Sequence, residues 1–265
     1  MLQDRVNAMP RDPKPPLPLR LGTARRKDGR MVLVAPLPGD SDRVVDLNRA
    51  EAARLQRLGE GAPELLAKAL VPPSLQALLE SGPRAVQRAR VALAYAEKWH
   101  RRGDLPSVVA PARAEVTLCP CLPAPKGVRR ADGTGALPPV RSAEMPLAQR
   151  PQPTLAAVGG FEGILGHCLA VEDPFGVTLG AWLETELDFS DRLEMQFGEH
   201  RQAMPMEVWA DLDAPNLAPG ELWLLPAPRF RPLPGLKEGG VVTLRTAFEE
   251  LTLTLEAGGL HPTVQ

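Results

Sequence analysis

The sequence predicts a mixed α/β protein in which strands and helices of the N-terminal part precede a strand-rich C-terminal part. Short apolar runs separated by proline and glycine indicate strands near residues 31–47, and helical spacing of apolar residues follows up to residue 100. Apolar and polar residues then alternate within 217–256. A chain of 265 residues with 44% hydrophobic content can bury one large core or two modest ones.

The N-terminal elements can be placed in chain order. Residues 31–35 (MVLVA) and 43–47 (RVVDL) read as a β-hairpin, and Asn48 is expected to cap the helix that follows. Further helices are predicted at 63–70, at 75–80 after a Ser74 cap, and at 84–100, where arginines lie opposite an apolar face.

The segment from about 105 to 159 is crowded with proline, arginine and glycine, and only residues 115–118 (EVTL) resemble a strand. Such a composition predicts a linker. The strands expected beyond it are residues 164–171, 177–189, 221–225 and 241–255.

Charge and composition exclude several classes of protein. Lys+Arg 31 against Asp+Glu 32 gives a formal charge of -1, so nothing favours nucleic acid as a partner. No apolar run approaches the roughly 20 residues that span a bilayer, so no membrane partner is expected. Three cysteines are too few for a disulfide framework, and we expect a soluble cytoplasmic protein.

The most suggestive polar motif is Glu184-Thr185-Glu186. Alternate residues of a strand point the same way, so two carboxylates on one face could share a divalent cation. The alternative is the solvent face of an antiparallel strand. A third oxygen ligand would come from elsewhere, with Asp211 and Asp213 among the available acids.

Cysteine and histidine offer weaker candidates. Cys119-Pro-Cys121 lacks the second ligand pair of a structural zinc site, and Cys168 is expected to be an inert buried thiol. His167 and His200 remain candidates for general acid–base chemistry, but sequence alone assigns no catalytic residue.

Two C-terminal stretches carry a family resemblance. Residues 217–225 (LAPGELWLL) and 236–242 (LKEGGVV) resemble the closing strands of the fumarylacetoacetate hydrolase superfamily. Residues 43–82 resemble its small cap domain, and 115–125 resemble the segment leading into its catalytic β-roll. The resemblance implies a mixed α+β fold, with a small N-terminal cap domain followed by a shortened mixed β-roll.

The resemblance also implies chemistry. In this superfamily a divalent metal, usually Mg²⁺, is held by carboxylates that include an E-x-E pair, and it polarises a carbonyl of a 2-oxo or 1,3-dicarbonyl acid. One alignment makes Glu184 and Glu186 the metal ligands. The other makes residues 182–186 a surface hairpin and implies that most of the metal-binding core is missing.

Two main hypotheses follow from these alignments. The first is a divergent relative with an eroded metal site, non-catalytic or acting as a partner subunit, without a cofactor. The second is a Mg²⁺-dependent hydrolase, decarboxylase or isomerase of small 2-oxo or 1,3-dicarbonyl acids that uses Glu184 and Glu186 with Asp211 or Asp213. A third is an interaction module that binds through the arginine-rich helix.

The expected domain organisation has four parts and a dimeric assembly. The chain divides into a disordered arm, a cap-like domain, a proline- and arginine-rich linker and the shortened roll, at residues 1–20, 21–118, 119–158 and 159–265. The resemblance favours a homodimer or a heterodimer with an intact family member.

Overall fold

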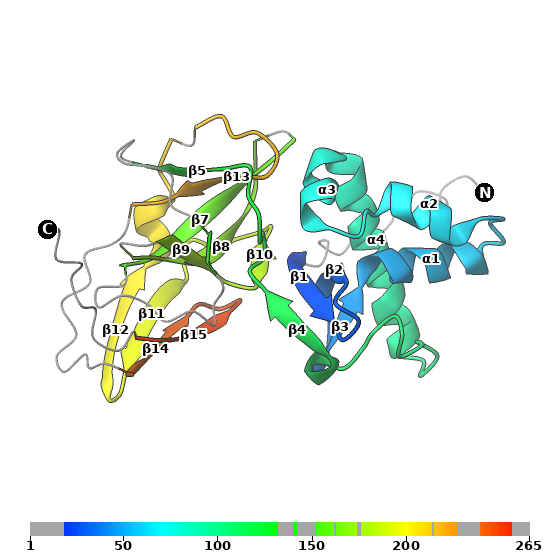
Figure 1. The fold of residues 1–265 in the computed structure, drawn as a ribbon, viewed down its shortest axis with the longest axis horizontal. Helices are drawn as coiled ribbons and strands as arrows, with labels where there is room; N and C mark the ends of the chain where they lie inside the picture. The colour runs from blue at the N-terminus through cyan, green and yellow to red at the C-terminus, as the bar shows by residue number, and fades with distance from the viewer. Residues whose placement is uncertain are drawn as a thin grey trace, which may run out of the picture.

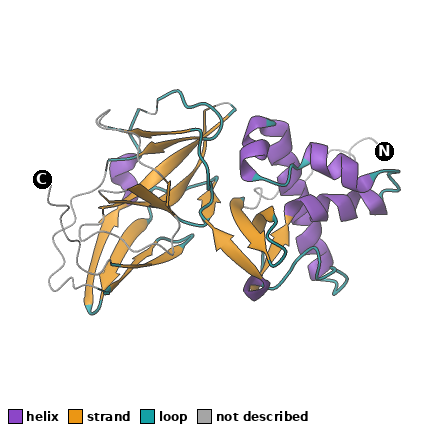
Figure 2. Ribbon diagram, viewed as in Figure 1, coloured by secondary structure: helices purple, strands orange, loops and turns teal. Residues whose placement is uncertain are grey.

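The structure is a computed structural model that describes residues 19–131, 140–141, 152–161, 163–173, 176–213, 215–226 and 239–255. The helices α1 to α4 gather on one side of the molecule beside β1, β2 and β3, and most of the other strands lie on the opposite side (Figures 1 and 2). No helix in these ranges is long and apolar enough to cross a bilayer.

The N-terminal lobe is a three-stranded meander covered by helices, on the right of Figure 1. Its elements are β1 (Arg20–Arg26), β2 (Met31–Leu37), β3 (Asp40–Asp46), α1 (Leu47–Arg57), α2 (Pro63–Leu70), α3 (Leu75–Glu80) and α4 (Pro83–His100). The predicted hairpin is confirmed, and Pro63 and the Ser74 cap begin α2 and α3 as expected. Proline at the first helical position loses no hydrogen bond, so Pro63 is a reliable signal for the start of α2.

The C-terminal lobe consists mainly of strands in two sheets. Its elements are the 3₁₀-helix η1 (Arg113–Glu115), β4 (Val116–Cys119), β5 (Gly127–Arg130), β6 (Val140–Arg141), β7 (Gln152–Gly160), β8 (Gly163–Asp173), β9 (Gly176–Leu179), β10 (Trp182–Glu184), β11 (Arg192–Phe197), β12 (His200–Pro205), the 3₁₀-helix η2 (Met206–Trp209), β13 (Glu221–Leu224), β14 (Val241–Arg245) and β15 (Glu250–Thr254). The main path of the large sheet runs β3-β2-β1-β10-β8-β7-β13-β5, and the smaller sheet runs β12-β11-β14-β15. The large sheet therefore passes from one lobe into the other.

Strands β7, β8 and β13 are buried on both faces. In β7, Ala156 and Val158 pack into the core shared with the helices, whereas Leu155 and Ala157 pack against the smaller sheet. Successive side chains of a strand point to opposite faces, so a continuous apolar run is what a strand between two cores requires. These strands join the two cores.

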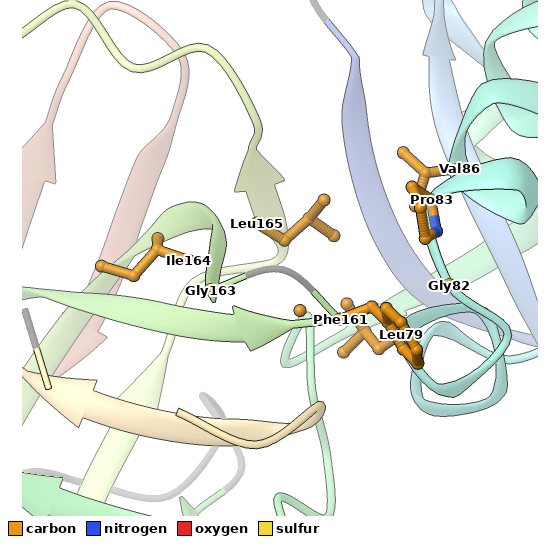
Figure 3. A pocket seen from close by; sticks show the side chains of 9 residues that line it. Leu79, Gly82, Pro83, Val86, Phe161, Gly163, Ile164 and Leu165 are labelled. Atoms are coloured by element: carbon orange, nitrogen blue, oxygen red, sulfur yellow. The ribbon is translucent and has the colours of Figure 1, made fainter. Parts of the chain in front are cut away.

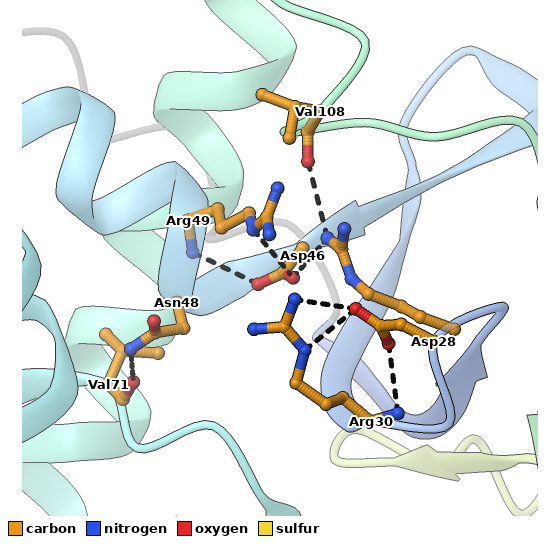
Figure 4. Close-up of polar contacts among 8 residues, drawn as sticks. Asp28, Arg30, Asp46, Asn48, Arg49, Val71 and Val108 are labelled. Carbon is orange, nitrogen blue, oxygen red and sulfur yellow. Dashed lines mark hydrogen bonds and ion pairs between the residues drawn. The ribbon is translucent and has the colours of Figure 1, made fainter.

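Asp46 connects β3, β1 and α1 (Figure 4). Its carboxylate accepts a hydrogen bond from the backbone N–H of Arg49, 3.1 Å away, and another from the Arg26 guanidinium at 2.6 Å. Asp46 is therefore the N-cap of α1, and the prediction of an Asn48 cap is wrong. The Asn48 amide instead donates to the carbonyl of Val71, which ties α1 to the end of α2.

Several predicted boundaries need correction. Leu19 is fully buried and Arg20 begins β1, so the expected arm ends earlier than residue 20; residues 1–18 lie outside the described part. The expected linker at 119–158 contains β5, β6 and most of β7, with Val128 buried. The prolines and arginines of this segment obscure the apolar pattern of its short strands, and these strands form because they pair with distant strands of the large sheet.

The final strands also differ from the prediction. Residues 241–255 form the hairpin β14–β15 rather than one strand, and they belong to the smaller sheet. Strand β13 belongs to the large sheet, where it pairs with β7 and, in parallel, with β5. The sequence identified the strands, but the pairing depends on residues distant in the chain.

Candidate functional site

Glu184 is a buried carboxylate at the junction of the two lobes. It ends β10, opposite Arg20 of β1 and His167 of β8, and only 4% of the residue is exposed. The Nε of Arg20 donates to its Oε2 at 2.7 Å. An arginine so close stabilises the ionised carboxylate and compensates part of its desolvation.

Glu186 lies beyond the end of β10 and is exposed. Its carboxylate forms an ion pair with Arg90 of α4 at 2.8 Å, and Arg90 also donates to the hydroxyl of Thr185. The expected strand at 177–189 is broken at Gly180 and Ala181, and it stops at Glu184. The alternation that would place both carboxylates on one strand face therefore does not reach Glu186.

The surface hairpin proposed for residues 182–186 is wrong, since Trp182, Leu183 and Glu184 are buried inside the large sheet. Asp211 and Asp213 follow η2 and belong to no strand. Among the described residues, no group of three or more His, Cys, Asp or Glu side chains could hold a metal ion. Glu184 and Glu186 are thus placed beside arginines rather than beside further acids.

The thiols and histidines occupy different environments. Cys121 and Cys168 are fully buried, as expected for Cys168, and the hydrogen bond with Cys121 together with burial raises the pKa of the Cys168 thiol well above its usual value. Burial lowers the pKa of His167 to about 4, so this imidazole is neutral at neutral pH, edge-on to the ring of Phe189. His200 is exposed on β12 in the smaller sheet.

One cavity of about 260 Å³ lies between the helices and the β7–β8 turn (Figure 3). It is lined by Leu79, Gly82, Pro83, Val86, Gly160, Phe161, Gly163, Ile164 and Leu165. All of these residues are apolar or glycine, so the cavity offers no acid, base or nucleophile from a side chain.

A second cavity, of about 310 Å³, contains titratable groups. It is lined by Arg113, Leu118, Cys119, Pro120, Leu179, Ala181, Trp182, Phe248, Glu249, Glu250 and Leu251. Glu249 is 8% exposed, and burial raises the pKa of its carboxyl group to about 7. Sequence reasoning missed this residue, because Glu249-Glu250 falls inside the run 241–255 that is expected to form one strand.

The local fold explains why Glu249 points inward. The hydroxyl of Thr246 accepts a hydrogen bond from the backbone N–H of Glu249, and the carbonyl of Glu249 accepts one from the backbone N–H of Thr246. This short turn between β14 and β15 places the Glu249 carboxylate over Gly180, where any side chain would collide with it.

Comparisons with known proteins identify the fold. No family model matches the chain, and no curated protein sequence matches it. Among solved structures, it resembles maleylpyruvate hydrolase from Sphingobium sp. SYK-6, with a TM-score of 0.55, 14% identity, and coverage of 90% of this chain and 100% of that one.

Two further structures agree. The 2-hydroxyhepta-2,4-diene-1,7-dioate isomerase from Mycobacterium marinum matches with a TM-score of 0.54 and 16% identity, over 91% of this chain and 99% of that one. The structure of maleylpyruvate hydrolase from Sphingobium sp. SYK-6 in complex with manganese (II) ion and pyruvate matches with a TM-score of 0.55 and 15% identity, over 90% of this chain and 99% of that one. These proteins are members of the fumarylacetoacetate hydrolase superfamily, and the chain has the fold of that superfamily.

Proposed function

We propose that this chain is a divergent, non-catalytic protein with the fumarylacetoacetate hydrolase fold that acts as a binding or partner subunit. In this proposal Glu184 and Glu186 hold the helical lobe against the sheets. The observation that supports it most is that each carboxylate pairs with its own arginine from the N-terminal lobe, Arg20 from β1 and Arg90 from α4.

Electrostatics supports this role over metal binding. A guanidinium at 2.7 Å occupies lone pairs of the Glu184 carboxylate that a hard cation would need, and it repels a second positive charge. Glu184 and Glu186 as placed here therefore do not fit a divalent cation. They fit ion pairs that cross the junction between lobes.

Glu184→Gln tests the proposal. The amide keeps a hydrogen-bond acceptor for Arg20 but removes the charge, so we expect a loss of about 1–2 kcal/mol in unfolding free energy. Calorimetric titration with Mg²⁺ or Mn²⁺ should give the same result for the variant and the original chain. Glu199→Gln, at an exposed hairpin turn, is the matched control and should change neither quantity.

The second candidate is a metal-dependent enzyme acting on 2-oxo or 1,3-dicarbonyl acids. The observation that favours it is the likeness to maleylpyruvate hydrolase solved with manganese and pyruvate. Metal-dependent turnover of an acylpyruvate or of oxaloacetate, abolished by Glu184→Gln, would overturn the non-catalytic proposal.

Assembly and location remain predictions that complete the proposal. We expect a homodimer, or a heterodimer with an intact relative, in the cytoplasm. Light scattering on the purified chain tests for the homodimer. Affinity capture with a tagged chain tests for the heterodimer. Substitution of the exposed residues Arg84 and Arg88 shows whether α4 is the interaction surface.

A further inference from the structure

The cavity around Glu249 has the composition of a small-molecule site. Its walls come from η1, from β4 and the residue after it, from the β9–β10 segment, and from the β14–β15 turn with the start of β15. Apolar side chains and polar groups share its surface about equally, and the polar side chains are those of Arg113, Cys119, Glu249 and Glu250. Apolar walls with a few polar side chains that converge on a concave site are typical of ligand sites.

The carboxyl group of Glu249 is incompletely paired in this cavity. Its Oε1 accepts a hydrogen bond from the backbone N–H of Ala181, whereas its Oε2 is buried and has no hydrogen-bond partner among the described residues. Leaving a buried polar atom without a partner is costly, so such an atom calls for an explanation. A ligand in the cavity would supply the missing partner.

The charges around the cavity favour an anion. The exposed guanidinium of Arg113 lines it, and no ion pair joins Arg113 to another described residue. The neighbouring Glu250 carboxylate pairs with Arg245 at 2.6 Å, which compensates its negative charge. Arg113 is therefore the uncompensated charge among the lining residues.

We propose that this cavity binds a small organic carboxylate with an apolar body. Arg113 supplies the countercharge, the protonated carboxyl group of Glu249 donates a hydrogen bond to a ligand oxygen, and Trp182 and Phe248 contact the apolar part. The site uses neither Glu184 nor Glu186 as a binding group, so its test is separate from that of the function proposed above.

Binding should depend on pH because Glu249 must carry its proton. Burial raises the pKa of the Glu249 carboxyl group to about 7. The backbone N–H groups of Ala181 and Trp182 lower this pKa, as do the charges of Arg113 and Arg20, but burial has the larger effect. Cys119 and Glu250 are the other titratable groups besides Arg113 that line the cavity, and the buried Cys168 also interacts electrostatically with Glu249. A ligand that needs the protonated form loses about tenfold in affinity between pH 6 and pH 8.

Titration calorimetry with benzoate tests the site, since this aromatic carboxylate stays ionised across that range and fits the apolar walls. We expect benzoate to bind at pH 6 and to weaken about tenfold at pH 8, and benzyl alcohol, which lacks the charge, to bind at least tenfold more weakly at pH 6. The absence of benzoate binding, or equal binding of the two probes, would overturn the proposal.

Two variants identify the groups involved. Arg113→Gln should weaken benzoate about tenfold, whereas Arg88→Gln on the exposed side of α4 should not. Glu249→Gln keeps a donor in place of the acid, so it should retain binding but lose the pH dependence. Equal affinities of the Arg113 and Arg88 variants would contradict the assigned countercharge, and this comparison stands even if the Glu249 variant does not fold.

Discussion

Asp46 shows how one carboxylate can serve a helix cap and an ion pair together. Its Oδ1 caps α1 and its Oδ2 pairs with Arg26, whose side chain is only 16% exposed. Asn is nearly as good a cap as Asp, whereas Ala cannot cap. We expect Asp46→Ala to cost about 2–4 kcal/mol and Asp46→Asn about half as much, measured by urea denaturation. Equal losses would mean that the cap contributes nothing.

His167 makes stability depend on pH. Its pKa is about 4 in the folded chain and 6.5 when unperturbed, so between these values the unfolded chain binds more protons. Stability from the neutral imidazole is therefore present above pH 6.5 and is lost as pH falls towards 4. His167→Gln should gain about 2–3 kcal/mol relative to the original chain between pH 7 and pH 4.5.

The matched control for that comparison is His200→Gln, on the exposed strand β12. Unfolding free energies of both variants and of the original chain, measured at the two pH values, cancel the titration of the shared acids. If the difference in unfolding free energy between His167→Gln and the original chain were the same at both pH values, burial would not suppress the protonation of His167.

At the level of elements, the sequence predicted the helix boundaries that are set by residues next to them in the chain. The boundaries of α2 and α3 follow from Pro63 and Ser74, and the apolar run 168–171 lies inside β8. Strand β1 was missed because its partners β2, β4 and β10 supply the burial that its polar sequence does not indicate. The bond from Arg20 to Glu184 joins residues 164 positions apart, so sequence could identify the E-x-E motif but not its partners.

Gly166 sets the spacing between β8 and β10. A Cβ on Gly166 would lie 2.4 Å from the carbonyl oxygen of Glu184, which is backbone and cannot rotate away. Gly166→Ala should force the strands apart and cost about 1–3 kcal/mol in urea denaturation. Gly61→Ala is the control, because a Cβ there meets no atom within 4 Å and its effect should stay below about 1 kcal/mol. Equal effects would contradict the close approach.

At the level of the whole molecule, the predicted division into cap, linker and roll does not describe the cores. Ala89 and Leu93 of α4 belong to the same core as Ala156 of β7 and Leu222 of β13. Sequence patterns show which positions are apolar, but they do not show that one sheet continues through both lobes. The chain is therefore expected to behave as one structural unit rather than as two domains joined by a linker.

Cooperative unfolding tests this unity. Far-ultraviolet circular dichroism reports mainly the N-terminal helices, whereas tryptophan fluorescence reports mainly the strand-rich part. Trp182 and Trp223 lie in strands and Trp209 of η2 belongs to the core of the smaller sheet, whereas only Trp99 lies in α4. With β7, β8 and β13 contributing to both cores, the two signals should change at the same urea concentration. Leu169→Ala, which removes a buried side chain facing the smaller sheet, should cost about 2–5 kcal/mol and lower both midpoints equally. If only the fluorescence midpoint moved, the helical lobe would be an independent domain and the continuous sheet would not couple the two lobes.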